Sequence, residues 1–115
     1  LNREWARDAQ CRVHALPQYY AASQAPFIEM LKAKGFTSAE IGTHAGLSDT
    51  ALALAVAPAL VRSDRLALGT KTSQMDGVSG DPRRSTAEIG QWGVHAIVDT
   101  TVAAIREAIR TRLVR

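Results

Sequence analysis

The segment at residues 42–61 limits the folds open to this chain more than any other part of it. It reads GTHAGLSDTALALAVAPALV, so a histidine between two glycines leads into a run at residues 51–57 that is almost uniformly apolar. A helix that is apolar on most sides has to be buried on most sides. Because a chain of 115 residues supplies few neighbours for such a helix, the segment indicates packing inside a larger core.

His44 and Asp49 carry the chemistry of this segment. Imidazole titrates near a pKa of about 6.5, so His44 can accept or donate a proton at neutral pH. A carboxylate such as Asp49 is a ligand for divalent metal ions. The structural alternatives are a histidine that bonds to the loop backbone and an aspartate that caps a helix at residues 50–57. The residues alone leave both pairs of alternatives open.

A second segment, at residues 76–90, reads DGVSGDPRRSTAEIG and predicts a glycine-rich loop that runs into a helix. The two segments together resemble the creatininase family, in their order and separation as well as in their motifs. The resemblance covers most of residues 37–115. The matching residues are His44, Ala45, Gly46, Asp49 and Thr50 in the first segment, and Gly77, Val78, Gly80, Asp81, Pro82, Thr86, Ala87, Glu88 and Gly90 in the second.

The resemblance implies a three-layer α/β fold with a parallel-type sheet, of which this chain supplies the helix-rich C-terminal half. Residues 1–115 are then the C-terminal portion of one domain, with no separate second domain. Leu1, Trp5 and Ala9 are spaced for one helix face, so we expect residue 1 to lie inside a helix and the chain to be a fragment or a processed product. The family is typically oligomeric, which implies a homo-oligomer.

The resemblance also implies roles for individual residues. His44 is expected to be catalytic, in proton transfer, and Asp49 to bind a divalent metal ion, Zn²⁺ or Mn²⁺. The family usually has Glu at the position that Asp49 matches. The other metal ligands of the family lie in the N-terminal half of its fold. The substrate is expected to be a small cyclic or formyl amide. Gly46, Asp76 and Gly77 are candidate binding residues, because glycines let backbone amides approach a ligand, and the alternative for the loop at residues 76–81 is a loop shaped only for turning. We therefore expect this chain to be inactive without the N-terminal half.

Charge, the length of the apolar run and cysteine content argue against nucleic-acid binding, a membrane span and an internal disulfide. The net charge is +3, and its surplus lies partly in the arginines of the last ten residues, where a helix C-terminus favours cations without any nucleic acid. The apolar run stops at Pro58, short of a membrane span. Cys11 is the sole cysteine, which excludes an internal disulfide. These features predict a cytoplasmic protein that binds neither nucleic acid nor membrane.

The sequence pattern predicts short strands at residues 11–16 and 66–68, and helices at residues 26–34, 49–57 and toward the C-terminus. Two capping boxes are expected to begin helices. Thr37 with Glu40 predicts a short helical turn, and Ser85 with Glu88 predicts the start of the last helix. In the last helix, three- and four-residue steps separate the apolar residues Ile89 and Trp92 and, further on, Val98, Val102, Ile105, Ile109 and Leu113.

A different class of function also fits the sequence. The chain would then be a non-catalytic helical interaction domain, whose long last helix and basic end bind a partner. The exposed surface that a small module would leave on the apolar helix argues against this alternative. A degenerate regulatory subunit of the same fold is a third possibility, supported by the aspartate at position 49.

Overall fold

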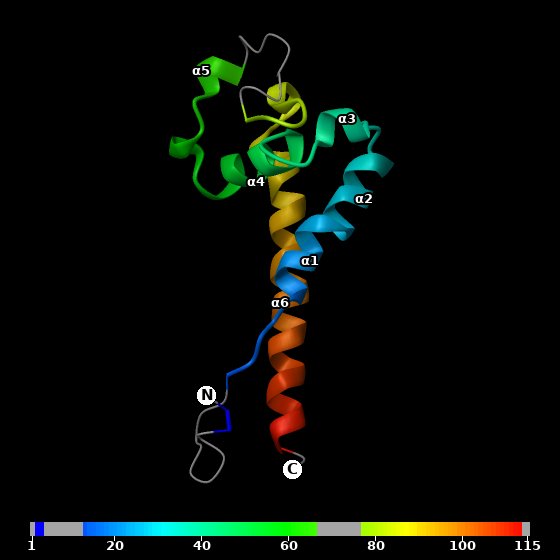
Figure 1. Ribbon diagram of the computed structural model, residues 1–115, viewed down its shortest axis with the longest axis vertical. Helices are drawn as coiled ribbons and strands as arrows, with labels where there is room; N and C mark the ends of the chain where they lie inside the picture. The colour runs from blue at the N-terminus through cyan, green and yellow to red at the C-terminus, as the bar shows by residue number, and fades with distance from the viewer. Residues whose placement is uncertain (1, 4–12, 67–76, 114–115) are drawn as a thin grey trace.

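Helices dominate the part of the chain that the computed structural model describes, which is residues 2–3, 13–66 and 77–113. Most of them gather around the N-terminal half of one long helix, α6 (Figure 1). None of the helices in these ranges is long and apolar enough to cross a bilayer. In chain order the elements are α1 (Gln18–Gln24), α2 (Pro26–Ala33), α3 (Ser38–Ile41), α4 (Leu47–Val56), η1 (Pro58–Leu60), α5 (Ser63–Leu66), η3 (Pro82–Arg84) and α6 (Ala87–Leu113).

The hydrophobic core lies where α2, α3 and α4 meet the first turns of α6. Its buried residues are Phe27, Leu31, Ile41, Leu47, Ala51 and Ile89. Trp92 is partly buried and packs against this cluster, with the Lys34 Nζ 5.2 Å from the centre of its ring. Trp92 therefore serves as a packing residue at the edge of this core.

Two glycines let α6 approach its neighbours closely. A Cβ on Gly90 would collide with the carbonyl oxygen of Ala51 in α4. A Cβ on Gly93 would lie 2.9 Å from the Phe27 ring and 2.8 Å from the Leu52 side chain. Because both positions lack a side chain, the backbone of α6 lies directly on α4 and on the core phenylalanine.

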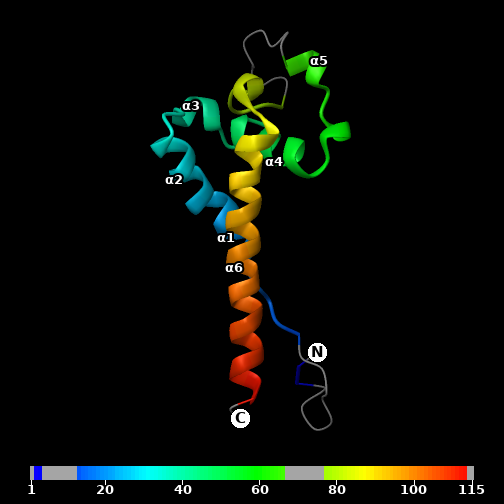
Figure 2. The same cartoon turned by 180° about the vertical axis from the view of Figure 1, so that it is seen from behind.

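The C-terminal half of α6 is arranged differently. No other described helix lies beside it in either view of the molecule (Figures 1 and 2). Val102, Ile105 and Ile109 in this half, and Val98 just before it, are between 37% and 56% exposed. With about 100° of rotation per residue, these four lie on one stripe, roughly 140° around the axis from the buried residues of the first turns. α6 thus has a second apolar face that the described residues do not cover.

Several predicted elements are confirmed, with differences at their ends. The helix expected at residues 26–34 is α2, which has proline at its first position. The Thr37–Glu40 capping box is present at the start of α3. The last helix is present, but its expected capping pair is wrong. Thr86 Oγ1 accepts a hydrogen bond from the Ile89 backbone N–H, whereas the Ser85 hydroxyl is buried and donates to the Leu47 carbonyl.

The predicted strands are not found in the described residues. Residues 13–16 have no regular structure, and Leu66 ends α5. A short alternating segment needs a neighbouring strand to form a ladder, and the described ranges contain a single isolated bridge, between His44 and Ser79. The sequence also did not predict α1, which follows Pro17 directly. Of the helix expected at residues 1–9, residues 2–3 form a turn, and the other residues lie outside the described ranges, as does Cys11.

Candidate functional site

The two family-like segments meet in space, although they are far apart in the chain. His44 and Ser79 form an antiparallel bridge, in which the Ser79 N–H donates to the His44 carbonyl at 2.8 Å and the His44 N–H donates to the Ser79 carbonyl at 3.3 Å. The Thr43 N–H donates to the same Ser79 carbonyl at 2.8 Å. The hydroxyl oxygens of Thr43 and Ser79 lie 2.8 Å apart. The backbone on which His44 sits is therefore fixed by the loop at residues 77–81.

Glycines make this backbone contact possible. Gly42 has a φ of +69°, and a Cβ there would overlap the Ser79 carbonyl oxygen. A Cβ on Gly80 would lie 2.7 Å from the Gly46 Cα. Gly46 itself is buried, so its position serves the packing of the two loops. The predicted contact between Gly46 and a substrate stays a prediction.

Asp49 caps the turn that carries His44, but not from the position the sequence predicts. α4 begins at Leu47 with Gly46 as its N-cap, so Asp49 lies inside the first turn. Its Oδ2 accepts a hydrogen bond from the Ala45 N–H at 2.8 Å. Ala45 has a φ of +52°, a left-handed conformation that is costly for a residue with a Cβ. The carboxylate therefore stabilises a strained turn, and its negative charge is favourable at a helix N-terminus.

His44 and Asp49 are both exposed, so each is accessible to a ligand. Among the residues that the structure describes, no three His, Cys, Asp or Glu side chains come together in a group that could hold a metal ion. His14 and His95 are exposed on other parts of the chain and do not join His44. The proposed metal role of Asp49 is thus one ligand of an incomplete set.

The remaining predicted binding residues lie in the loop before Ser79. Gly77 is exposed and has a φ of +72°. Asp76 lies outside the described residues. The loop is anchored at its other end, where the Asp81 N–H donates to the Glu40 carbonyl at 2.9 Å. Contact between this loop and a substrate stays a prediction.

A cavity of about 300 Å³ opens beside the turn that carries His44. Asp49 and Thr43 line it together with residues of α1, α2, α3 and α4, and most of the lining residues are of polar types. The sequence analysis did not predict α1, so it did not identify the cavity residues that α1 supplies. The only signal for them was the polar pair Ser23 and Gln24, which lies between two prolines. The full lining is Ser23, Gln24, Ile28, Lys32, Ser38, Ile41, Gly42, Thr43, Ser48 and Asp49.

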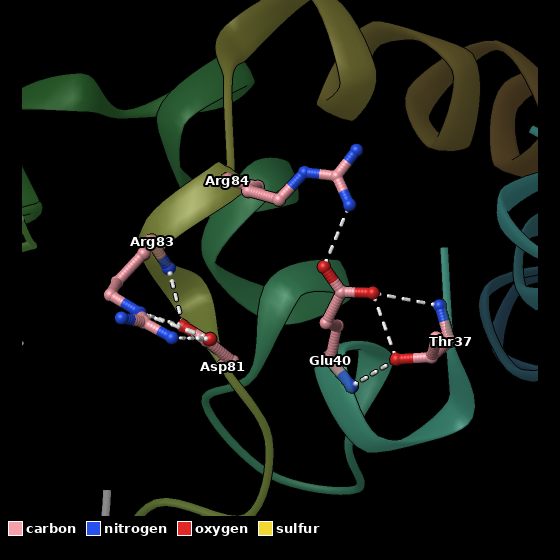
Figure 3. A network of polar contacts seen from close by, with 5 residues as sticks. All are labelled: Thr37, Glu40, Asp81, Arg83 and Arg84. Carbon is pink, nitrogen blue, oxygen red and sulfur yellow. Dashed lines mark hydrogen bonds and ion pairs between the residues drawn. The ribbon is translucent and has the colours of Figure 1, made fainter. Parts of the chain in front are cut away.

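Two ion pairs lie next to the loops of the site, one at η3 and one between η3 and α3 (Figure 3). Hydrogen bonds from the Thr37 backbone N–H and from the Arg84 side chain lower the pKa of Glu40 from 4.5 to about 2. Hydrogen bonds from the side chain and backbone of Arg83 lower the pKa of Asp81 from 3.8 to about 2. Both carboxylates are therefore ionised at neutral pH. Sequence reasoning identified Glu40 only as a capping residue and gave Arg83 and Arg84 no role.

Comparison with known families adds an observation on the whole chain. The sequence model of the creatininase family, described as creatinine amidohydrolase, matches residues 1–105. The chain belongs to the creatininase family. The match includes both loops of the site and most of α6. Comparisons with curated proteins and with solved structures gave no match.

Membership of the creatininase family confirms the resemblance seen in the motifs. Members of this family are amidohydrolases and are generally metal-dependent. The class of chemistry that the family supports is therefore hydrolysis of a C–N bond, in agreement with the sequence-based expectation.

Proposed function

We propose that this chain is the C-terminal portion of a metal-dependent amidohydrolase that acts on a small cyclic or formyl amide. The observation that carries the proposal is the bridge between His44 and Ser79, which brings both family motifs into one site. The proposal includes the three-layer α/β fold with its parallel sheet, to which residues 1–115 contribute the helical C-terminal portion of a single domain. It also includes a cytoplasmic location.

In this proposal His44 transfers the proton to the leaving nitrogen of the amide. An amide nitrogen is a poor leaving group until it is protonated, and a positioned imidazole supplies such a proton near neutral pH. His44 is suited to this task because its side chain is exposed while its backbone is held on both sides by Ser79. The bridge and the capped turn together limit how far the imidazole can move from its place.

A divalent ion, Zn²⁺ or Mn²⁺, would polarise the amide carbonyl and activate water. The described residues do not form such a site by themselves, because only Asp49 and His44 lie in this turn. We propose that Asp49 supplies one oxygen and that the N-terminal half of the fold supplies the remaining ligands. This chain's own contribution is then the proton transfer and the placement of one carboxylate.

The second apolar face of α6 supports completion of the fold by more protein. Ile105 and Ile109 are 42% and 56% exposed, and contiguous exposed apolar surface marks a contact with another protein surface. We propose that the N-terminal half of the same fold covers part of this surface, as a longer chain or as a second chain. We further propose that the complete protein is a homo-oligomer.

The deciding experiment measures amide hydrolysis and metal content together, on the protein as isolated from its natural source. Creatinine, small cyclic amides and N-formyl amides serve as substrates. His44→Ala is expected to lower kcat about 100-fold or more, whereas His95→Ala, at an exposed position on α6, is the matched control with unchanged kcat. Asp49→Ala is expected to lower the bound metal. Full hydrolysis by the His44→Ala variant would refute the assigned role.

The exposed α6 face also supports the second candidate, a non-catalytic interaction domain or a degenerate regulatory subunit. This alternative predicts a stable protein that binds no metal and hydrolyses none of the amides. A metal-free, inactive protein of unchanged fold would favour it over the hydrolase.

A further inference from the structure

One ion pair joins α3 and η3, the helical elements next to the two loops of the site. The Arg84 Nη1 of η3 donates to the Glu40 Oε1 of α3 at 2.7 Å, across 44 residues of sequence (Figure 3). α3 ends directly before the turn that carries His44, and η3 directly follows the loop that carries Ser79. The pair therefore connects the supports of the two loops.

Glu40 is held firmly enough to act as an anchor. Its Oε2 accepts hydrogen bonds from the Thr37 N–H at 2.9 Å and from the Thr37 hydroxyl at 2.8 Å. Its carbonyl accepts the Asp81 N–H at 2.9 Å. Glu40 thus binds its own helix with one carboxylate oxygen, and it binds the other segment with the second oxygen and with its backbone.

Arg84 is held on two sides as well. Its guanidinium carbon lies 4.4 Å from the centre of the Phe36 ring, so the cation rests over an aromatic face while it donates to Glu40. Such stacking limits the freedom of a long side chain and favours one orientation of the guanidinium.

Arg83 is the natural contrast. It is the preceding residue and carries the same charge, but its Nε donates to Asp81 at 2.9 Å, within its own turn. Figure 3 shows the two side chains pointing to different carboxylates. Loss of the Arg83 pair would remove a contact within residues 81–83 and none to α3, whereas loss of the Arg84 pair would remove a side-chain bond between η3 and α3.

We propose that Glu40 and Arg84 are positioning residues for His44. The ion pair holds η3 against α3, this keeps Ser79 seated on the loop at residues 42–46, and the Ser79 bridge fixes the backbone of His44. The inference rests on the proposed function in its reference to His44 as the proton-transfer group. The effect on the backbone can be measured without any activity.

The first test compares Arg84→Gln with Arg83→Gln by amide hydrogen exchange of the full chain. The reporter is the Thr43 N–H, which donates to Ser79, and the reference is an amide of the buried core residue Leu31. An exposed ion pair of ordinary strength predicts that exchange at Thr43 rises about two- to fivefold in Arg84→Gln. We expect no such rise in Arg83→Gln and no change at Leu31 in either variant.

Two results would overturn the proposal. One is an equal rise at Thr43 in both arginine variants. The other is a rise at Thr43 and Leu31 together in Arg84→Gln, because the pair would then be a general stabiliser. Arg84→Lys retains one charged donor and is expected to restore part of the protection at Thr43.

The second test uses hydrolysis by the complete enzyme. Arg84→Gln is expected to lower kcat about two- to fivefold with little change in KM, and Arg83→Gln to leave both constants unchanged. His44→Ala separates the two hypotheses. If that variant keeps full activity, the assigned role of His44 fails, while the exchange difference between the arginine variants still decides whether Glu40 and Arg84 position the loop.

Discussion

The two halves of α6 differ in how far their apolar residues are buried by the rest of the described chain. In the first turns, Gly90 and Gly93 bring the helix backbone onto α4 and the core, and Ile89 is 8% exposed. In the last turns, Ile105 is 42% exposed and Ile109 is 56% exposed. The two sets of apolar residues lie on different faces of the helix, roughly 140° apart around its axis. A helix can therefore be predicted from its sequence although the described residues cover only one of its two apolar faces.

The largest expected loss of stability comes from a substitution in the core that packs against the first half of α6. Phe27 is fully buried and contacts the position of Gly93. Phe27→Ala is expected to lower the free energy of unfolding by about 3–5 kcal/mol, because it removes buried apolar surface and leaves a cavity. Urea denaturation followed by helical circular dichroism measures the loss. A loss below about 1 kcal/mol would contradict a packed core at this end of α6.

The next effect tests the close approach of α6 and α4. Gly90→Ala places a Cβ against the Ala51 carbonyl oxygen, so we expect a loss of about 1–3 kcal/mol from overpacking. Helix propensity alone predicts the opposite sign, a gain of up to about 1 kcal/mol. The direction of the change in the urea midpoint therefore decides. A stabilised Gly90→Ala variant would mean that the two helices do not touch at this position.

A smaller effect is expected in acid, from the ion pair behind the site. The pKa of Glu40 falls from 4.5 to about 2 in the folded chain, so its contribution to stability is present above about pH 4.5 and is lost as the pH falls toward 2. Glu40 faces Arg84 and, at longer range, Arg83. In Glu40→Gln, the free energy of unfolding should fall less between pH 4.5 and 2 than in the wild type.

The matched control for this titration is Asp81→Asn, which removes the other carboxylate with a lowered pKa. That variant should retain the part of the acid dependence that belongs to Glu40. Identical pH profiles for Glu40→Gln and the wild type would contradict the strong hydrogen bonding of Glu40.

The smallest effect on stability is expected in the last turns of α6. Ile109→Ser changes a side chain that is 56% exposed, so the free energy of unfolding of the chain should change by less than about 0.5 kcal/mol. The same substitution should weaken association in the complete protein if this face is covered there. Analytical ultracentrifugation of the isolated protein measures the association, with the exposed residue Thr111 as the position of a control substitution. Unchanged association would remove this face from the proposed contact.

Local sequence signals predicted helices well where the physical cause was local. The Thr37–Glu40 box predicts α3 because its hydrogen bonds join residues three positions apart. Gly35 follows α2 and has a φ of +88°, as expected for a glycine that ends a helix. The prediction for residues 13–16 was wrong because an alternating pattern specifies a strand only where a neighbouring strand is available.

The two motifs could be read from the sequence, but the way the fold brings them together could not. The motifs identify His44 and Asp49, and the capping role that was one alternative for Asp49 is present in another form, through Ala45. The pair of Glu40 and Arg84 could not be predicted, since its partners are 44 residues apart and no local pattern links them.

The sequence by itself determined the family, the positions of the glycines and the apolar periodicity of α6, because these depend on residue type and on spacing along the chain. Only the tertiary structure decided that Ser79 pairs with the backbone of His44, that Arg84 rather than Arg83 reaches α3, and which face of α6 is covered. The physical reason is range. Conformational preference acts between near neighbours, whereas backbone pairing, ion pairs and burial depend on which distant segments the fold brings together.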